Sequence, residues 1–242
     1  MGRLKRKLIS AAVCVLFVLA LMAAAGLDRA EQKKGNVNAG AVSRQTQEQK
    51  YCVVIDAGHG GFDPGKVGVG GVLEKDINLK IALILKGYLE ADDIEVVLTR
   101  DGDYGLYEEK ESNKKVQDMK NRVALITETS PDLTVSIHQN SYPEEYVHGA
   151  QVFYYEDSPE GQKLAQVIQE QIAASADPEN TRQIKPNTSY YLLKKTPVPI
   201  VIVECGFLSN NSETQKLCSE EYQQRVAWAV HMGIMRYLNR VR

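Results

Sequence analysis

Two histidines and two glutamates stand at the ends of predicted strands and helices, and their side chains are the best suited to chemistry in this chain. They are His59, Glu74, His138 and Glu204. Imidazole and carboxylate groups suit zinc, and a catalytic zinc site uses three protein ligands and leaves a fourth position for water. A histidine–glutamate–histidine set would supply those ligands, and the remaining acid, Glu204, could take a proton from the water. The wide spacing of these residues is not a local motif, so structural roles stay open for each.

His59 follows an apolar run and has glycines on both sides. The residues of Val53–Ile55 are β-branched, which is typical of a strand buried on both faces in an α/β sheet. The glycines of segment 58–61 let the chain bend tightly, so an ion or ligand could approach the imidazole from the carboxyl end of the strand. A glycine-rich turn whose histidine only forms a local hydrogen bond is the alternative.

Strand patterns alternate with helical patterns along the rest of the chain. Further strands are predicted at residues 95–99, 133–137, 150–154, 190–193 and 200–204, and helices are predicted to begin near Glu74, Asn113, Ser158 and Ser219. Polar or glycine-rich loops are predicted at residues 62–73, 101–115 and 178–187. This alternation predicts an α/β fold. If the strands are parallel and adjacent, His59 and His138 emerge at the same edge of the sheet.

Three of the acidic and histidine residues also fit structural roles. Glu74 stands in the first turn of a predicted helix, where the helix dipole favours an acid without any function. His148 precedes a predicted strand, and we expect it to be a surface or loop residue, with a substrate contact or a spare ligand as the alternative. His231 lies one residue beyond the apolar stripe of the last helix, so we expect it to be structural.

The first 50 residues are predicted to lie outside the folded domain. Four basic residues precede a long apolar stretch, in which Ala23 and Ala25 form a small-residue cleavage site. Residues 1–26 are therefore predicted to be a cleaved export signal, with a retained membrane anchor as the alternative. Residues 27–50 lack large apolar side chains and are predicted to be a flexible linker. The remaining domain, residues 51–242, is predicted to be exported.

Size, charge and cysteine content limit the class of this protein. A chain of 242 residues with 43% hydrophobic composition can bury one substantial core. Its formal net charge is -2, and loss of the four basic residues of the signal would make it -6, which argues against nucleic acid as a partner. Cys52, Cys205 and Cys218 follow the signal, and this odd, sparse set argues against a disulfide scaffold, although one pair stays open.

Five segments of the sequence together resemble a known enzyme family. They read Asp56-Ala-Gly-His59-Gly-Gly, Glu74-Lys-Asp, Leu98-Thr-Arg100, Ser136-Ile-His138 with Asn140-Ser, and Glu204-Cys-Gly-Phe207-Leu-Ser-Asn210. On these segments, residues 51–238 resemble the zinc-dependent N-acetylmuramoyl-L-alanine amidases of the third amidase type. The resemblance implies a twisted, mostly parallel six-stranded sheet flanked by helices. It also implies that His59, Glu74 and His138 bind zinc and that Glu204 is the catalytic acid/base.

The same resemblance implies a substrate and partners. It implies hydrolysis of the amide between N-acetylmuramic acid and L-alanine in peptidoglycan, with contacts to the stem peptide and the glycan, in the cell wall, outside the cell or between the spore membranes. An accessory activator protein is a further candidate partner. The run Tyr190-Tyr-Leu-Leu-Lys-Lys-Thr is similar to the subgroup that acts on spore-cortex peptidoglycan. Glu204 would pass the proton of the attacking water to the leaving amine, and the loop Gly65–Gly71 would form one wall of the groove.

Two alternatives and one departure from the family pattern stay open. A zinc exopeptidase would need a cation such as Arg182 for a terminal carboxylate, and a non-catalytic peptidoglycan-binding module would have lost the chemistry that Glu204 supplies. Gln139 stands where the family pattern would have a small residue; it could narrow the groove, but we expect it to touch no ligand. The sequence does not single out a side chain that would donate a hydrogen bond to the oxyanion of the reaction. Arg182, His148 and Asn140 are the candidates.

Overall fold

The computed structural model describes residues 50–240, so the predicted signal or anchor and nearly all of the predicted linker lie outside the described residues. Six strands form one sheet in the order β2-β1-β3-β6-β4-β5. Their bounds are β1 (Cys52–Ala57), β2 (Glu95–Leu98), β3 (Leu133–Asn140), β4 (Gln151–Tyr155), β5 (Lys185–Asn187) and β6 (Ile200–Phe207). β1, β2, β3 and β6 run parallel, whereas β4 is antiparallel to β6 and β5 is parallel to β4. The predicted mostly parallel six-stranded sheet is confirmed.

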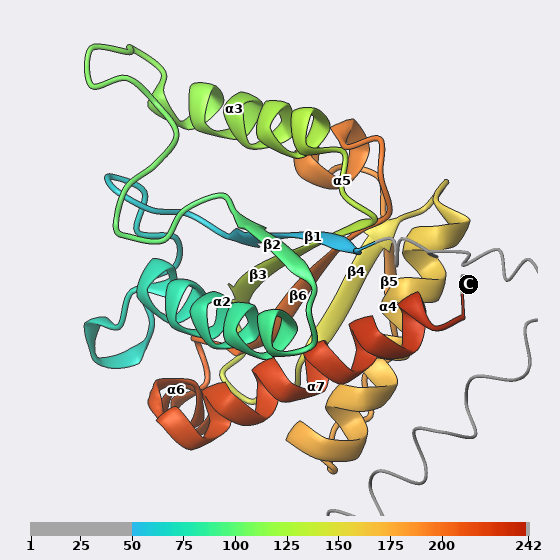
Figure 1. Ribbon diagram of the computed structural model, residues 1–242. Coiled ribbons are helices and arrows are strands. Elements are labelled where there is room, and N and C mark those ends of the chain that lie inside the picture. Colours follow the sequence, from blue (N-terminus) through green and yellow to red (C-terminus); the bar gives the residue numbers. More distant parts are fainter. Residues whose placement is uncertain (1–49, 241–242) are drawn as a thin grey trace, which may run out of the picture. The chain divides into compact units, whose positions relative to one another are not determined.

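Helices cover both faces of this sheet (Figure 1). One face carries α2 (Glu74–Ala91), α4 (Pro159–Gln171) and α7 (Glu220–Leu238), and the other carries α3 (Lys114–Thr129) and α5 (Tyr191–Lys195). The bounds of the shorter elements are Ile172–Ala176 for a π-helical turn after α4, Asn211–Cys218 for α6, and Val69–Gly71 for a 3-10 turn. Among the described residues, no helix is both long and apolar enough to span a membrane.

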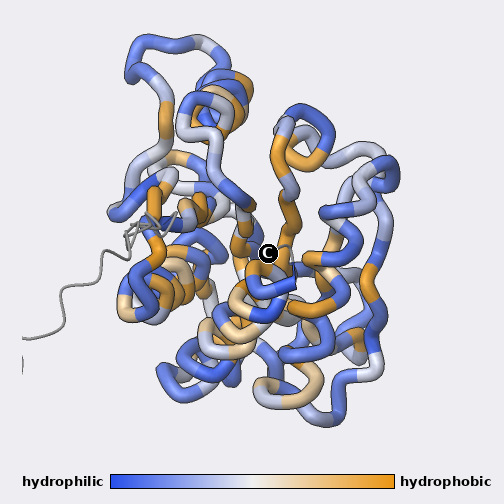
Figure 2. The backbone as a smooth tube through the Cα atoms, turned by 45° about the vertical axis from the view of Figure 1, so that its right-hand side comes forward, coloured by the Kyte–Doolittle hydropathy of each residue, from blue (hydrophilic) through white to orange (hydrophobic). Residues whose placement is uncertain are grey.

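The sheet divides the apolar core into two layers. Val53 and Ile55 of β1 belong to the layer shared with α2, α4 and α7, whereas Val54 belongs to the layer shared with α3 and α5. This division arises because successive side chains of a strand point to opposite faces. Figure 2 shows the apolar residues gathered along the central strands. The prediction that residues 53–55 are buried on both faces of a sheet is confirmed.

Side-chain caps begin three of the predicted helices. Asn113, Ser158 and Ser219 each accept, through a side-chain oxygen, a hydrogen bond from the backbone N–H three residues further on. Each cap satisfies a donor that the first helical turn would otherwise leave unpaired. The fourth predicted helix begins at Glu74 itself, which places this acid in the first turn as predicted.

The predicted strand at residues 190–193 is wrong, because the chain there enters helix α5. The sixth strand is instead β5, which lies inside the predicted loop 178–187. Oδ1 of Asn187 accepts hydrogen bonds from the backbone N–H groups of Ser189 and Tyr190, at 2.8 and 2.7 Å, and so turns the chain after β5. A short apolar run fits a strand or one turn of a buried helix equally well, and periodicity alone does not separate them.

His138 lies within β3, because this strand continues to Asn140 and does not end at residue 137 as predicted. The register pairs His138 with Glu204 of β6, and β1 pairs with β3 as far as Ala57 and Ile137. The carboxyl ends of β1, β3 and β6 therefore meet at one edge of the sheet. His59 and His138 emerge at this same edge, as predicted.

The cysteines do not cross-link this domain. Cys52, Cys205 and Cys218 are all free thiols, so the disulfide pair that the sequence left open is not formed. Cys205 is fully buried among apolar side chains, and burial raises the pKa of its thiol. The described part of the chain thus relies on its two core layers for stability, as expected from the cysteine count.

Candidate active site

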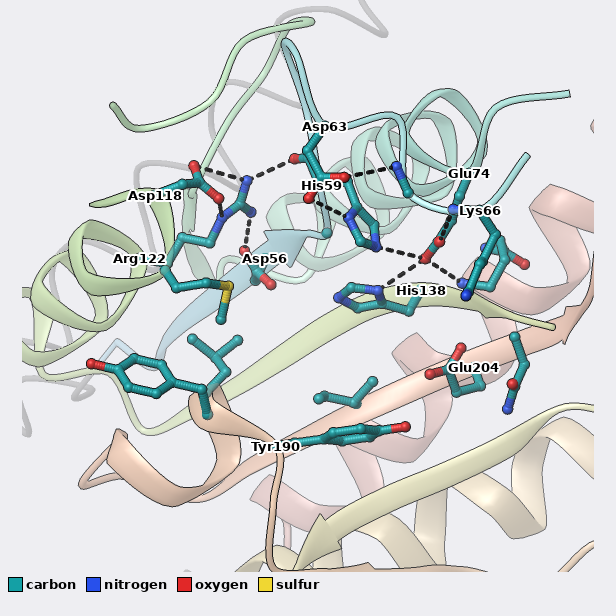
Figure 3. A pocket seen from close by; sticks show the side chains of 18 of the residues that line it. Asp56, His59, Asp63, Lys66, Glu74, Asp118, Arg122, His138, Tyr190 and Glu204 are labelled. Atoms are coloured by element: carbon teal, nitrogen blue, oxygen red, sulfur yellow. Dashed lines mark hydrogen bonds and ion pairs between the residues drawn. The ribbon is translucent and has the colours of Figure 1, made fainter. Parts of the chain in front are cut away.

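Three residues with metal-binding side chains converge at the carboxyl edge of the sheet (Figure 3). His59 follows β1, Glu74 opens α2, and His138 belongs to β3. Nε2 of His59 lies 3.2 Å from Oε1 of Glu74, and Nδ1 of His138 lies 2.9 Å from the same oxygen. One ligand atom from each residue lies within 4.8 Å of the other two, so the three could hold one metal ion.

The imidazole of His59 is oriented by an acid in the glycine-rich turn. The φ angle of His59 is 62°, in the left-handed region that few residues other than glycine adopt. Oδ2 of Asp63 lies 3.0 Å from Nδ1 of His59, which leaves Nε2 of the ring facing Glu74. A carboxylate on the second ring nitrogen commonly fixes the orientation of a metal-binding histidine. Asp63 was not predicted from the sequence, although an acid four residues after His59 in the same turn was a usable signal.

Two buried arginines hold the turn that carries His59. Arg122 of α3 and Arg100, which follows β2, donate hydrogen bonds to backbone carbonyl oxygens of residues 57–59 at distances of 2.7–3.0 Å. Arg122 also donates to Oδ1 of Asp56 at 2.6 Å. Burial alone would raise the pKa of Asp56, but the charge of Arg122 and the hydroxyl of Ser136 lower it to about 2. Asp56 is therefore ionised, and its pair with Arg122 fixes the end of β1.

Arg122 was not singled out from the sequence, although its position carried a signal. It lies three residues after Met119 and four residues before Ile126, on the face of the helix predicted to be apolar. A charged side chain on such a stripe must either disrupt the core or find a buried partner. Asp56 is that partner.

Glu74 is almost completely enclosed and fully ionised. Its Oε1 accepts a hydrogen bond from the backbone N–H of Gln139 at 3.1 Å, and its Oε2 accepts one from the backbone N–H of Lys66 at 2.8 Å. Burial opposes the charge, but His138 and His59 hold the pKa of Glu74 well below its usual range. In turn, although burial would lower it, Asp63 and Glu74 raise the pKa of His59 to about 9. Without a metal, the cluster therefore holds a proton on His59.

Two glycines leave the room that these side chains occupy. A Cβ atom added at Gly58 would lie 2.3 Å from the ring of His138. One added at Gly65 would lie 2.5 Å from Oε2 of Glu74 and 2.7 Å from the ring of His59. These distances are shorter than the contacts that Cβ atoms make in proteins. A larger residue at Gly58 or Gly65 would therefore displace the side chain of His138, Glu74 or His59.

Glu204 stands beside the three potential ligands and outside their cluster. It belongs to β6, opposite His138, and is only 7% exposed. Its Oε2 atom is buried and has no hydrogen-bond partner among residues 50–240. Burial, with a smaller contribution from the charge of Glu74, raises the pKa of Glu204 to about 7, and the two histidines limit the rise. A carboxyl with this pKa can accept and release a proton near neutral pH.

A cavity of about 360 Å³ opens in front of these groups. In Figure 3, His59, Glu74 and His138 lie along its upper side, with Arg122 of α3 beside them, and Tyr190 lies along its lower side. Met119, Tyr190 and Leu192 add apolar surface to the lining. Of the loop Gly65–Gly71, which was expected to form a wall, Gly65 and Lys66 line the cavity.

His148 and Arg182 do not reach this cavity. Arg182 donates from Nε to the backbone oxygen of His148 at 2.6 Å, and its guanidinium stacks over the ring of Phe207 at 4.7 Å. His148 is exposed, as expected for a loop residue. Of the three candidate oxyanion donors, Asn140 alone lines the cavity.

The remaining two predictions concern Gln139 and His231. His231 is buried in α7, with its Nε2 atom 2.7 Å from Asp92, and it plays the structural role expected of it. The expectation that Gln139 touches no ligand is wrong, because its backbone N–H binds Glu74. Its side chain is buried and donates to Asn78 of α2 at 3.1 Å, which ties it to the helix that Glu74 opens.

Comparisons with known proteins agree with this geometry. Residues 53–236 match the family model described as N-acetylmuramoyl-L-alanine amidase. The germination-specific N-acetylmuramoyl-L-alanine amidase of Bacillus subtilis is 38% identical over 188 residues, which cover 76% of this chain and 78% of that relative.

Solved structures give the same result. The CwlD amidase from Clostridioides difficile, solved in complex with the GerS lipoprotein, has a TM-score of 0.77 and 39% identity, over 78% of this chain and 99% of that one. The amidase AmiC2 of Nostoc punctiforme has a TM-score of 0.69 and 34% identity, over 78% and 97% of the two chains. Because the family model spans most of the chain and these relatives share its fold and much of its sequence, the chain belongs to the N-acetylmuramoyl-L-alanine amidase family.

Proposed function

We propose that this amidase holds zinc with His59, Glu74 and His138 and uses Glu204 as its general base. The observation that carries the proposal is the convergence of three ligand atoms within 4.8 Å beside the buried carboxylate of Glu204, whose Oε2 atom has no hydrogen-bond partner among the described residues. Two imidazole nitrogens and one carboxylate oxygen form a known catalytic zinc set. When bound, zinc supplies a Lewis acid that acidifies water and polarises an amide carbonyl.

The residues around the cluster fit such an ion. Asp63 occupies Nδ1 of His59, so Nε2 is the nitrogen free to bind metal. Both histidines point to one oxygen of Glu74, and a proton on His59 balances the charge there while no metal is bound. A divalent cation would replace that proton, so binding should become tighter as the pH rises.

Glu204 then carries the proton through the reaction. It accepts a proton from the attacking water and donates it to the amine nitrogen of L-alanine as the amide bond breaks. Its burial without a hydrogen-bonding partner raises the pKa to about 7, which suits both transfers. This arrangement argues against a non-catalytic binding module, which would have no use for an unpaired buried acid.

We infer that the substrate is peptidoglycan and that the stem peptide and the glycan both contact the enzyme. The relative at 38% identity is named a germination-specific amidase, which supports a role in the spore cortex. The CwlD amidase was solved with the GerS lipoprotein, which supports an accessory protein partner for this chain also. We further propose export to the cell wall or spore, with residues 51–242 as the catalytic domain.

The cation that the sequence suggested for an exopeptidase does not lie at the cavity. An exopeptidase would need a free cation to bind the terminal carboxylate of a peptide, and Arg182 was the candidate in the sequence. Arg182 is instead bound to the backbone of His148 and stacked on Phe207, away from the cavity.

Digestion of purified peptidoglycan by the zinc-loaded protein tests the proposed function. Mass spectrometry should find stem peptides with a free L-alanine amine and intact glycan chains that carry lactyl carboxylates. A panel of plain peptides serves as the control for exopeptidase activity. Shortened glycan chains, or loss of D-alanine without release of the L-alanine amine, would contradict the proposed bond.

A further inference from the structure

Tyr190 presents a free hydroxyl to the cavity opposite the reacting groups. It lies immediately before α5 and lines the same cavity as Glu204 and His138. Figure 3 shows its ring along the lower side of the cavity, with the hydroxyl turned toward Glu204. Burial and the charges of Glu204 and Glu74 raise the pKa of Tyr190, so the hydroxyl keeps its proton and remains a hydrogen-bond donor.

The backbone and the aromatic ring of Tyr190 are both held by neighbouring residues. Its backbone N–H donates to Asn187, its carbonyl oxygen accepts from the N–H of Lys194, and its ring packs against Phe153 with 5.6 Å between centroids. In the described part of the chain, the hydroxyl itself forms no hydrogen bond. Tyr155 offers a comparison, because it packs against the same apolar cluster but does not line the cavity.

Amide hydrolysis gains from a second donor to the carbonyl oxygen, beside the polarisation that bound zinc would supply. Negative charge develops on the carbonyl oxygen when water attacks an amide, and a fixed donor aimed at that oxygen is among the strongest catalytic aids. The guanidinium groups of Arg100 and Arg122 already bind Asp56 and backbone oxygens, and Arg182 lies outside the cavity. Asn140 also lines the cavity, but its side-chain oxygen accepts a hydrogen bond from the backbone N–H of Ser141 at 2.8 Å, which holds its side chain against the chain that follows β3. The hydroxyl of Tyr190, which lines the cavity and has no hydrogen-bond partner among residues 50–240, fits this requirement.

We propose that Tyr190 is a catalytic residue, whose hydroxyl donates a hydrogen bond to the carbonyl oxygen of the scissile amide as that oxygen becomes negative. The inference rests on the proposed amidase function. The water oxygen bonds to the carbonyl carbon and its proton passes to Glu204. The carbon–nitrogen bond then breaks, and that proton moves to the amine of L-alanine. Tyr190 keeps its own proton throughout.

The test compares Tyr190→Phe with Tyr155→Phe in the zinc-loaded protein. Both changes remove one hydroxyl from a half-buried ring in the same apolar cluster. Zinc content, thermal unfolding, kcat and KM on purified peptidoglycan fragments are measured for each. We expect Tyr190→Phe to lower kcat by about 10²-fold, the scale of one lost oxyanion donor, with KM and zinc content unchanged. Tyr155→Phe should leave kcat unchanged.

Three outcomes would overturn the assignment. An unchanged kcat in Tyr190→Phe would show that the hydroxyl does not assist the chemical step. A higher KM at constant kcat would place the hydroxyl on another part of the substrate. Loss of zinc together with activity would make Tyr190 a structural residue. Failure of the proposed function is a separate result, because the unsubstituted protein would then release no L-alanine amine.

Discussion

The acids of the site have pKa values that the surrounding residues push in opposite directions. Two histidines hold the pKa of Glu74 below its usual range, whereas burial raises the pKa of Glu204 to about 7. Such divergence between neighbouring carboxylates is a common sign of divided roles in catalysis. Glu74 is therefore suited to hold a cation, and Glu204 is suited to move a proton.

Substitution of either histidine tests the metal assignment. His59→Ala and His138→Ala each remove one of three ligands, so zinc content and activity should be lost together. His231→Ala is the matched control, because this buried histidine contacts Asp92, which follows the C-terminal end of α2, and the change should leave zinc in place. Elemental analysis of the purified variants gives the answer, and full zinc occupancy in either ligand variant would exclude that residue.

Glu204→Gln separates proton transfer from metal binding. The amide keeps the shape of the carboxylate but accepts no proton, so kcat should fall by about 10² or more. Zinc content should stay at that of the unsubstituted protein. Turnover near the original rate with zinc bound would remove Glu204 from the mechanism.

The raised pKa of Glu204 also predicts a pH-dependent cost in stability. Its pKa in the folded, metal-free protein is about 7, against an ordinary value of 4.5. The protonated carboxyl therefore favours folding below pH 4.5, and this advantage is lost as the pH rises through 7. Between pH 4.5 and pH 8, the free energy of unfolding of Glu204→Gln should gain about 3 kcal/mol relative to the unsubstituted protein.

Denaturant unfolding of both metal-free proteins at the two pH values measures this difference. Comparing the variant with the unsubstituted protein cancels the titration of the other groups to a first approximation. An identical stability difference at pH 4.5 and pH 8 would mean that Glu204 titrates normally.

The sequence indicated the four residues that the structure brings together at the cavity, because their types and positions were both informative. His59 and Glu204 follow uninterrupted β-branched runs, and such strands end at the functional edge of an α/β sheet. The residues that support them were harder to find. Arg122 acts through contacts to Asp56 and His59 that only the folded chain brings together, and a short pattern does not record those contacts. Asp63 lies four residues after His59, but an acid in a polar loop does not by itself indicate that it orients a histidine.

At the scale of elements, the strands of the parallel half were predicted well and the edge of the sheet was not. β1, β3 and β6 are buried on both faces, so each begins with an apolar or β-branched run and carries its polar residues mainly toward its carboxyl end. β5 is a short edge strand of Lys185–Asn187, with little apolar content to mark it. The apolar run after it forms α5, which is the element that places Tyr190 at the cavity.

The turn after β1 gives a test at this scale. In Gly58→Ala, the new methyl group would meet the ring of His138 at 2.3 Å, so the ring must move away from Glu74 and zinc affinity should fall. Gly87→Ala is the control, since nothing lies within 4 Å of a Cβ atom there and the residue is inside α2. That control should stabilise the fold by about 0.5–1 kcal/mol.

Competition with a zinc chelator and denaturant unfolding together read out both glycine variants. The expected pattern is weaker zinc binding in Gly58→Ala alone. Equal zinc affinity in the two variants would show that the ring of His138 can shift away from the new methyl group and still bind zinc.

At the scale of the whole domain, the site depends on both helical layers. Glu74 belongs to α2 on one face of the sheet. Arg122 belongs to α3 on the other face and donates a hydrogen bond to the backbone oxygen of His59. Arg100 joins the two sides, because it donates to the backbone of residues 57 and 58 and also to the carbonyl oxygen of Lys75 in α2. A change that disturbs the packing of α3 should therefore weaken zinc binding, although α3 provides none of the proposed ligands.

Arg122→Met tests this dependence. It removes the partner of the fully buried Asp56 and leaves an unpaired charge, which should cost about 3–5 kcal/mol of folding free energy. It should also weaken zinc binding, because the carbonyl oxygen of His59 loses its donor. Lys120→Met is the control, since Lys120 is exposed on the same helix and should change neither quantity.

A second substitution separates the two effects of Arg122. Asp56→Asn in the Arg122→Met background removes the unpaired charge, so part of the lost stability should return and a double-mutant cycle should give a favourable coupling between the two residues. Zinc affinity should stay low, because the asparagine does not replace the hydrogen bond to His59. If zinc affinity returned in step with stability, the effect of Arg122 on the site would be a consequence of folding free energy alone, and α3 would have no separate role in positioning His59.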